Sequence, residues 1–217
     1  MHSNWHTSIH DYSAKHSTPE DPFLQAIHHF TWKKMINPRM LSEHLQGLLL
    51  SQLVAIHKPK QVLEIGTFTG YATACLLKNL LPDSEIHTIE ADEETLWKTK
   101  NFWKQHQKDH LVNWYSGNAL DILTNWGETK NFDFIFVDAD NSNYKNYLDN
   151  TKDILNINGI LLFDNTLWSN RVVIESDRNT DKDTKNMHEF NVYAQSLTEF
   201  ETVLLPIRDG LTMMRKR

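Results

Sequence analysis

The sequence of 217 residues lacks several features that define particular protein classes. Cys75 is its only cysteine, so no disulfide can form within the chain, and its apolar surroundings predict a small buried side chain. The 22 basic residues are outnumbered by 28 acidic ones, and a formal net charge of −6 argues against a nucleic-acid partner. No apolar run approaches the roughly 18 residues that span a membrane. Because residues 1–6 also lack a secretory pattern, we expect a cytoplasmic protein.

The length suits a single domain with an N-terminal extension. Residues 1–20 are polar, with four histidines (His2, His6, His10, His16) whose spacing fits no structural zinc site. We expect them to form a flexible, irregular N-terminal segment. The single domain then covers residues 21–217, with N-terminal helices in 21–58 and the core in 59–217.

From residue 61 onward, strand patterns alternate with helical patterns. Five strands are predicted, at about 61–65, 85–90, 111–116, 132–137 and 159–163, and helices at about 71–81, 92–106, 119–126, 141–155 and 187–198. Such alternation predicts a parallel sheet with helices on both faces. Two last strands, about 200–206 and 210–216, are joined by a turn too short for a parallel crossover. The fold class is therefore α/β and Rossmann-like, a seven-stranded mostly parallel sheet with an antiparallel edge strand.

A turn with two glycines, Gly66 and Gly70, follows the first strand, where ligands of such sheets bind. Its spacing is not G-x-G-x-x-G, which argues against a nicotinamide dehydrogenase. Glu64, inside the apolar strand, is either a buried carboxylate bonded to backbone amides or a group that holds the amino-acid part of a cofactor. Glu90, which ends the second strand, either accepts the hydroxyls of a ribose or is an exposed acid at a helix start. Residues 117–119 place small side chains near an adenine edge.

Oxygen-bearing side chains follow the fourth and fifth strands. Asp138 and Asp140 come after an apolar run, and Asp164 and Asn165 come after the next. Both strand ends fall on one rim of the sheet, so Asp138, Asp164 and Asn165 are expected to converge. Hard oxygen ligands suit magnesium or a similar cation. The alternative is ordinary turn and helix-cap chemistry, in which Asp and Asn are common.

Four stretches in order, 62–71, 132–140, 164–168 and 205–212, resemble the cation-dependent O-methyltransferase family that includes catechol and caffeoyl-coenzyme A O-methyltransferases, particularly its bacterial members. The resemblance implies a class I methyltransferase fold, S-adenosylmethionine as methyl donor, a divalent cation (Mg²⁺, or Ca²⁺ or Mn²⁺), a small hydroxylated aromatic acceptor and a homodimer. It implies metal ligation by Asp138, Asp164 and Asn165, and substrate contacts from Asp140 and Trp168. Cofactor contacts are implied for Met40, Ser42, Glu64, Gly66, Thr67, Gly70, Tyr71, Glu90, Ala119 and Asp138.

One position departs from the family pattern. Family members place a lysine, thought to act as general base, where this chain has Asn141. Three interpretations stay open: the metal held by Asp138 and its partners suffices, Lys145 substitutes from the same helix face, or catalysis is weak or has another acceptor. Alternative functions are a cofactor- and metal-binding protein without turnover and an RNA hydroxyl methyltransferase. The polar stretch 170–186 is interpreted either as a mobile surface loop or as a lid.

Overall fold

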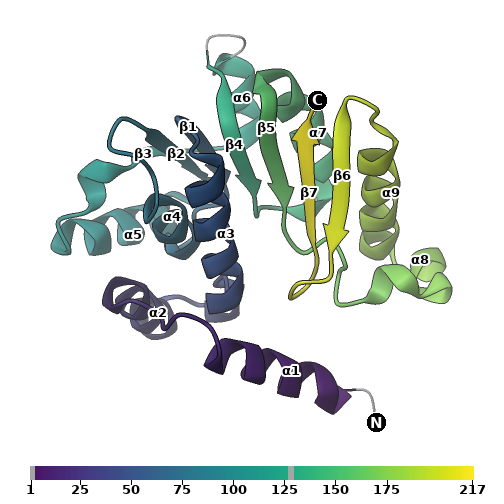
Figure 1. Ribbon diagram of the computed structural model, residues 1–217, viewed down its shortest axis with the longest axis horizontal. Helices are drawn as coiled ribbons and strands as arrows, with labels where there is room; N and C mark the ends of the chain where they lie inside the picture. The colour runs from purple at the N-terminus through teal and green to yellow at the C-terminus, as the bar shows by residue number, and fades with distance from the viewer. Residues whose placement is uncertain (1–2, 127–129) are drawn as a thin grey trace.

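A computed structural model describes residues 3–126 and 130–217. The chain forms one seven-stranded sheet of order β3-β2-β1-β4-β5-β7-β6 (Figure 1). Its strands are β1 (Gln61–Ile65), β2 (Glu85–Glu90), β3 (Asn113–Ser116), β4 (Phe132–Val137), β5 (Leu155–Phe163), β6 (Phe200–Leu205) and β7 (Leu211–Lys216). The described helices are α1 (Ser3–Lys15), α2 (Pro22–Lys34), α3 (His44–His57), α4 (Tyr71–Leu77), α5 (Glu93–Gln105), α6 (Ala119–Trp126), α7 (Tyr144–Ile154), α8 (Glu175–Thr180) and α9 (Lys182–Ser196).

The sheet confirms the predicted fold class. Strands β3, β2, β1, β4 and β5 pair in parallel, and β7 pairs antiparallel with both β5 and β6. The antiparallel strand therefore lies one position in from the edge, and the edge strand β6 runs parallel to β5. The short turn between β6 and β7 permits only an antiparallel hairpin, and β7 is the strand of that hairpin that lies next to β5.

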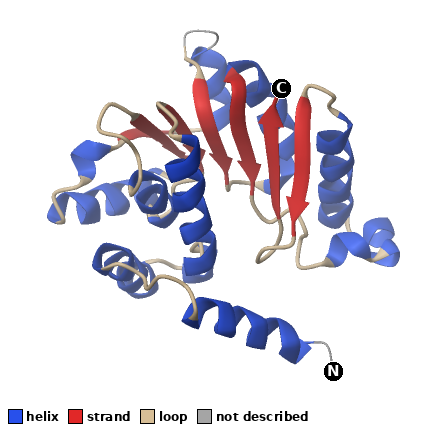
Figure 2. Cartoon of the chain, in the orientation of Figure 1, coloured by secondary structure: helices blue, strands red, loops and turns tan. Residues whose placement is uncertain are grey.

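Helices cover both faces of the sheet (Figure 2), as the alternation predicted. On β4, Phe134 and Phe136 face one apolar cluster, and Ile135 and Val137 face the other. The first cluster includes buried side chains of α2, α3, α4 and α5, and the second those of α6, α7 and α9. Burial on both faces explains why β4 reads as a continuous apolar run. No helix in the described part of the chain is long and apolar enough to cross a membrane.

The prediction of an irregular N-terminal segment is wrong over Ser3–Lys15, which forms α1. Residues 1 and 2 lie outside the described residues. The polar composition gave no apolar periodicity, but α1 contacts α3, and His10 Nε2 lies 3.0 Å from Glu43 Oε2 just before α3. The helix is thus supported by contacts with a distant part of the chain.

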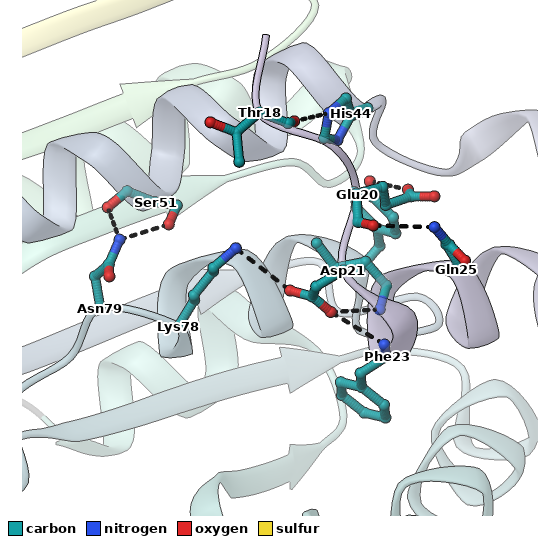
Figure 3. Close-up of polar contacts among 11 residues, drawn as sticks. Thr18, Glu20, Asp21, Phe23, Gln25, His44, Ser51, Lys78 and Asn79 are labelled. Carbon is teal, nitrogen blue, oxygen red and sulfur yellow. Dashed lines mark hydrogen bonds and ion pairs between the residues drawn. The ribbon is translucent and has the colours of Figure 1, made fainter.

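The segment that follows α1 is attached to α3 and α4 (Figure 3). The carbonyl of Thr18 lies 2.7 Å from His44 Nε2, and Asp21 lies 3.5 Å from Lys78 Nζ. The hydroxyl of Tyr71 donates a hydrogen bond to Glu20. These contacts fix the N-terminal helices, so that residues 35–42 cover the carboxyl ends of the central strands.

Two further segments differ from prediction. Residues 141–143 form a 3-10 helix, and α7 begins only at Tyr144. The polar stretch 175–186 contains α8 and the first turn of α9, where Asp181 accepts a hydrogen bond from the backbone amide of Thr184 at 2.8 Å. A side-chain cap therefore starts α9 about five residues before the helix predicted at about 187–198.

Candidate active site

A cavity of about 890 Å³ lies at the carboxyl ends of the central strands. The turns after β1 and β4 contribute Gly66 and Asp138 to its wall, and the last residue of β2 contributes Glu90. The segment before α3 contributes Met40 and Ser42. This is the position where open α/β sheets bind ligands. Other residues that the sequence assigned to the site also line the cavity: Thr67, Tyr71, Ala119, Asp140, Asn141 and Asn165.

Gly66 brings two strand ends into close approach. Its φ is +100°, and a Cβ there would lie 1.9 Å from the carbonyl oxygen of Asp138. The backbone amide of Asp138 donates to the carbonyl of Ile65 at 2.8 Å. Only glycine fits this crossing, which leaves the turn open toward the cavity.

Glu90 is held at the cavity by backbone amides. Its Oε2 accepts a hydrogen bond from the amide of Phe68 at 2.8 Å, and its Oε1 accepts one from Asp92 at 3.0 Å. Each carboxylate oxygen retains a lone pair for a ligand hydroxyl. The glycine turn and the end of β2 are therefore joined through this carboxylate.

Two of the predicted cofactor residues are absent from the described lining of this cavity. Glu64 is fully buried beneath it, where Oε2 accepts hydrogen bonds from Thr73 at 2.5 Å and Thr88 at 2.6 Å, and Oε1 has no partner. Burial raises the pKa of Glu64 to about 8. Gly70 shapes the turn instead, because a Cβ there would lie 2.6 Å from Trp103 Nε1. The buried-carboxylate interpretation of Glu64 fits this placement, with threonine hydroxyls as donors in place of backbone amides.

Of the predicted metal ligands, Asp138 and Asn165 line the cavity, whereas Asp164 is fully buried behind its wall. Desolvation and the nearby charge of Asp164 raise the pKa of Asp138 well above its usual range, and burial raises the pKa of Asp164. Asn165 lines the cavity beside Asp138, and its backbone amide donates to Asp164 Oδ1 at 2.8 Å. Among the described residues, no three His, Cys, Asp or Glu side chains form a metal-binding group. A cation site here therefore depends on the amide oxygen of Asn165 besides the two carboxylates.

The sequence analysis missed two residues of this corner, Gln46 and Arg208. Gln46 is buried on α3, and its Nε2 donates to Asp164 Oδ2 at 2.7 Å. Arg208 lines the cavity, and its Nη1 lies 3.5 Å from the same oxygen. A signal for Gln46 was present, because this polar residue shares a helical face with Leu49, Leu50 and Leu53. Arg208 lies in a turn and has no comparable signal.

The expectation that Lys145 shares the face of Asn141 is wrong. Asn141 lines the cavity, whereas Lys145 is exposed and its Nζ lies 4.8 Å from the ring centre of Tyr193. The four-residue argument assumed one continuous α-helix, but α7 begins after Asn141. Instead, Tyr147 reaches the cavity and donates a hydrogen bond to Asp140.

Trp168 lies in a smaller cavity of about 230 Å³ that also includes Asn141. Ser142, Asp183 and Asn186 complete its described lining. Asn141 belongs to the walls of both cavities, so the two spaces adjoin at this residue. Substrate contacts were expected from Asp140 and Trp168, and the structure places Asp140 in the wall of the larger cavity and Trp168 in the wall of the smaller one.

Known proteins share both the sequence pattern and the fold. The sequence model of a family described as O-methyltransferase matches residues 14–217. Tapetum-specific methyltransferase 1 of Arabidopsis thaliana is 33% identical over 184 residues, which cover 79% of this chain and 76% of that protein. Caffeoyl-CoA O-methyltransferase of Medicago sativa is 30% identical over 179 residues, which cover 79% of this chain and 72% of that protein.

A solved structure, the SAH-bound methyltransferase PaMTH1 of Podospora anserina, superimposes with a TM-score of 0.90 over 100% of this chain and 97% of that chain. At 23% identity this likeness establishes the fold. Together with the match of the family model to most of the chain, it confirms the resemblance noted in the sequence. The chain belongs to the O-methyltransferase family.

Proposed function

We propose that the protein transfers a methyl group from S-adenosylmethionine to a hydroxyl of a small phenolic or catechol-like acceptor. The observation that carries this proposal is the single cavity in which the glycine turn, Glu90 and the Asp138 corner meet. The two curated relatives named above carry methyltransferase names, and PaMTH1 is a methyltransferase with SAH bound.

The cofactor end of the cavity is built by strand-end turns. Gly66 admits a close ligand, Glu90 offers oxygens to ribose hydroxyls, and Ala119 leaves room beside an adenine. Met40 and Ser42 lie in the segment that covers this end, and Thr67 and Tyr71 line it. When bound, S-adenosylmethionine supplies a methyl group on a positively charged sulfur.

The oxygens of Asp138, Asp164 and Asn165 fit a hard cation, and we propose that they would hold Mg²⁺, or Ca²⁺ or Mn²⁺. Such a cation, when bound, acidifies an acceptor hydroxyl. Asn141 lies where it can donate or accept a hydrogen bond, but its amide does not take up a proton. These residues therefore act chiefly by aligning the acceptor with the methyl group.

The acceptor end is proposed to extend from Asp140 past Asn141 to Trp168, through the smaller cavity. Tyr147 and Asn143 both donate hydrogen bonds to Asp140, which fixes its carboxylate. An aromatic acceptor would pack on Trp168 while its hydroxyls face the Asp138 corner.

Three further proposals rest on the sequence and the family resemblance. Residues 21–217 form one domain with helices in 21–58 and a core in 59–217. The protein is a homodimer, and it is cytoplasmic. Size-exclusion chromatography with light scattering tests the dimer.

The activity is tested with methyl-labelled S-adenosylmethionine and a panel of catechols, caffeoyl-CoA and simple phenols. We expect a methylated product and S-adenosylhomocysteine in equal amounts. Glu90→Ala should raise the KM for the cofactor at least about tenfold, because the ribose loses a charged hydrogen-bond partner. Glu93→Ala, at the exposed start of α5 and absent from the cavity lining, is the matched control. Cofactor binding without any product would support the alternative of a binding protein without turnover.

A further inference from the structure

Three successive residues after β5 lie in the left-handed region of backbone conformation. Trp168, Ser169 and Asn170 have φ angles of +51°, +53° and +62°. Residues with a side chain adopt this region at a cost, and they usually do so singly. A run of three such residues therefore has to be held in place by its surroundings. The first of them, Trp168, lines the smaller cavity.

The turn between β6 and β7 holds this left-handed run through hydrogen bonds. The amide of Leu167 donates to the carbonyl of Asp209 at 2.7 Å, and the amide of Thr166 donates to the carbonyl of Gly210 at 3.1 Å. These two bonds fix the residues just before the run. A third bond reaches the run itself, because the amide of Ser169 donates to the carboxylate oxygen Oδ1 of Asp209.

The other hydrogen bonds of the run are local. The amide of Trp168 donates to the carbonyl of Asn165 at 3.1 Å, and the carbonyl of Trp168 accepts from the amide of Arg171 at 2.9 Å. Both bonds span three residues, so they shape the turn without fixing where it lies. Among the described residues, the bond from Ser169 to Asp209 is the one hydrogen bond that joins residues 168–170 to a distant part of the chain.

The backbone of the run determines where the indole of Trp168 lies. The indole is partly buried against the apolar cluster that contains Tyr144 and Phe190, and it also lines the smaller cavity. The backbone conformation sets the direction in which a side chain leaves its Cα atom. A run released from Asp209 would therefore turn the indole away from the cavity, which adjoins the larger cavity at Asn141.

We propose that Asp209 is a positioning residue for the acceptor, because its carboxylate holds the left-handed run and keeps Trp168 in the acceptor site. The inference rests on the proposed function, in which an aromatic acceptor packs on Trp168. Asp209 is absent from the described lining of both cavities, so it acts through the turn. Packing on the indole is the same before and during methyl transfer. Its loss therefore raises the KM for the acceptor and leaves kcat nearly unchanged.

The first test measures steady-state methyl transfer to catechol by the wild type, Asp209→Ala and Asp209→Asn. Asp209→Ala keeps the backbone carbonyl that accepts from Leu167 and removes the carboxylate. We expect it to raise the KM for catechol at least about fivefold, with kcat and the KM for S-adenosylmethionine within about twofold of the wild type. Asp209→Asn keeps an oxygen that accepts from Ser169, so all three constants should stay within about twofold.

Asp133→Ala is the matched control for the loss of a carboxylate that accepts backbone amides. Asp133 Oδ2 accepts from the amides of Lys60 at 2.8 Å and Gln61 at 3.0 Å. It lies near the amino end of β4, at the rim of the sheet opposite to the cavity. The substitution should lower the Tm and leave the KM for catechol unchanged.

The second test asks whether Asp209 acts through Trp168. Trp168→Ala should raise the KM for catechol at least about fivefold, and the further change Asp209→Ala in that variant should alter it by less than about twofold. Two independent effects would instead multiply. Circular dichroism confirms folding of each variant. If Asp209→Ala fails to fold, Asp209→Ser takes its place, because its hydroxyl oxygen falls one bond short of the carboxylate oxygen.

The outcomes separate the inference from the proposed function. An active wild type and a folded Asp209→Ala with the same KM for catechol overturn the role of Asp209 and leave the methyltransferase proposal intact, and so do effects of Asp209→Ala and Trp168→Ala that multiply. If the wild type forms no product, the proposed function fails, and saturation-transfer NMR of catechol with the S-adenosylhomocysteine complex decides the inference. Weaker binding by Asp209→Ala than by Asp209→Asn supports it, whereas equal binding or no binding overturns it.

Discussion

At the scale of single residues, Gly66 determines how closely β1 and β4 approach at the cavity. Alanine there would meet the carbonyl oxygen of Asp138 and adopt a φ of +100°. We predict that Gly66→Ala lowers the free energy of unfolding by about 2 to 4 kcal/mol, from backbone strain and a steric clash. Urea denaturation measures this change.

Gly117→Ala is the matched control for the clash. Gly117 also has a positive φ of +131°, but a Cβ there meets only Ile122 Cδ1, at 3.8 Å. The free energy of unfolding of Gly117→Ala should fall by about 1 to 2 kcal/mol, through backbone strain alone. An equal loss in the two variants would contradict the close approach at Gly66.

The raised pKa of Glu64 makes the free energy of unfolding depend on pH. Its pKa is about 8 in the folded chain and 4.5 in the unfolded chain, so between these values the folded state retains a proton that the unfolded state releases. The free energy of unfolding therefore falls as pH rises from about 4.5 to about 8, with a slope of up to about 1.4 kcal/mol per pH unit from this group.

The variant Glu64→Gln lacks this titration. The free energy of unfolding of this variant should fall less steeply with pH than that of the wild type across pH 5–8. The difference between the two free energies should therefore grow in favour of the variant as pH rises. Urea unfolding at four pH values measures this difference. Parallel profiles would show that Glu64 is ionised in the folded state throughout the range.

At the scale of elements, the start of α2 depends on one side chain. Asp21 accepts hydrogen bonds from the amides of Phe23 at 3.0 Å and Leu24 at 3.1 Å, and it pairs with Lys78 at 3.5 Å. We predict that Asp21→Ala lowers the free energy of unfolding by about 1 kcal/mol, mainly through loss of the cap.

Asp21→Asn separates the cap from the ion pair, because asparagine keeps an oxygen acceptor and loses the charge. It should retain most of the stability, since partly exposed ion pairs contribute less than about 1 kcal/mol. Lys78→Gln should have a similarly small effect. If Asp21→Asn were as damaging as Asp21→Ala in chemical denaturation, the ion pair would be the dominant interaction.

At the scale of the whole molecule, the cavity joins the N-terminal segment to the sheet. A ligand that spans Met40, Gly66 and Glu90 binds the folded state alone and raises its stability. We predict that S-adenosylhomocysteine at 100 times its Kd raises the Tm by about 5 to 10 °C, from about 2.7 kcal/mol of linkage in a chain of this size.

Differential scanning fluorimetry with NAD as the comparison ligand checks this prediction. NAD should leave the Tm unchanged, because the turn lacks the G-x-G-x-x-G spacing. Stabilisation by NAD alone would instead indicate a dinucleotide-binding protein. Glu90→Ala should reduce the shift produced by S-adenosylhomocysteine.

The sequence by itself determined the order of strands and helices and the turns that follow each strand. These features are local: alternation of apolar runs predicts the parallel sheet, and the ends of parallel strands must share a rim. Gly66, Glu90, Asp138 and Asn165 could therefore be assigned to one cavity from their positions after strands. Helix α1 was missed because its support comes from α3, which is distant in the sequence.

Only the tertiary structure decided which side chains meet at the chemical corner. Gln46, Asp164 and Arg208 are far apart in the chain, and their contact depends on how α3 and the final hairpin pack against the end of β5. Lys145 lies away from the cavity because a 3-10 helix precedes α7 and shifts the helical face. Side-chain direction and long-range charge pairing depend on packing, which no short stretch of sequence encodes.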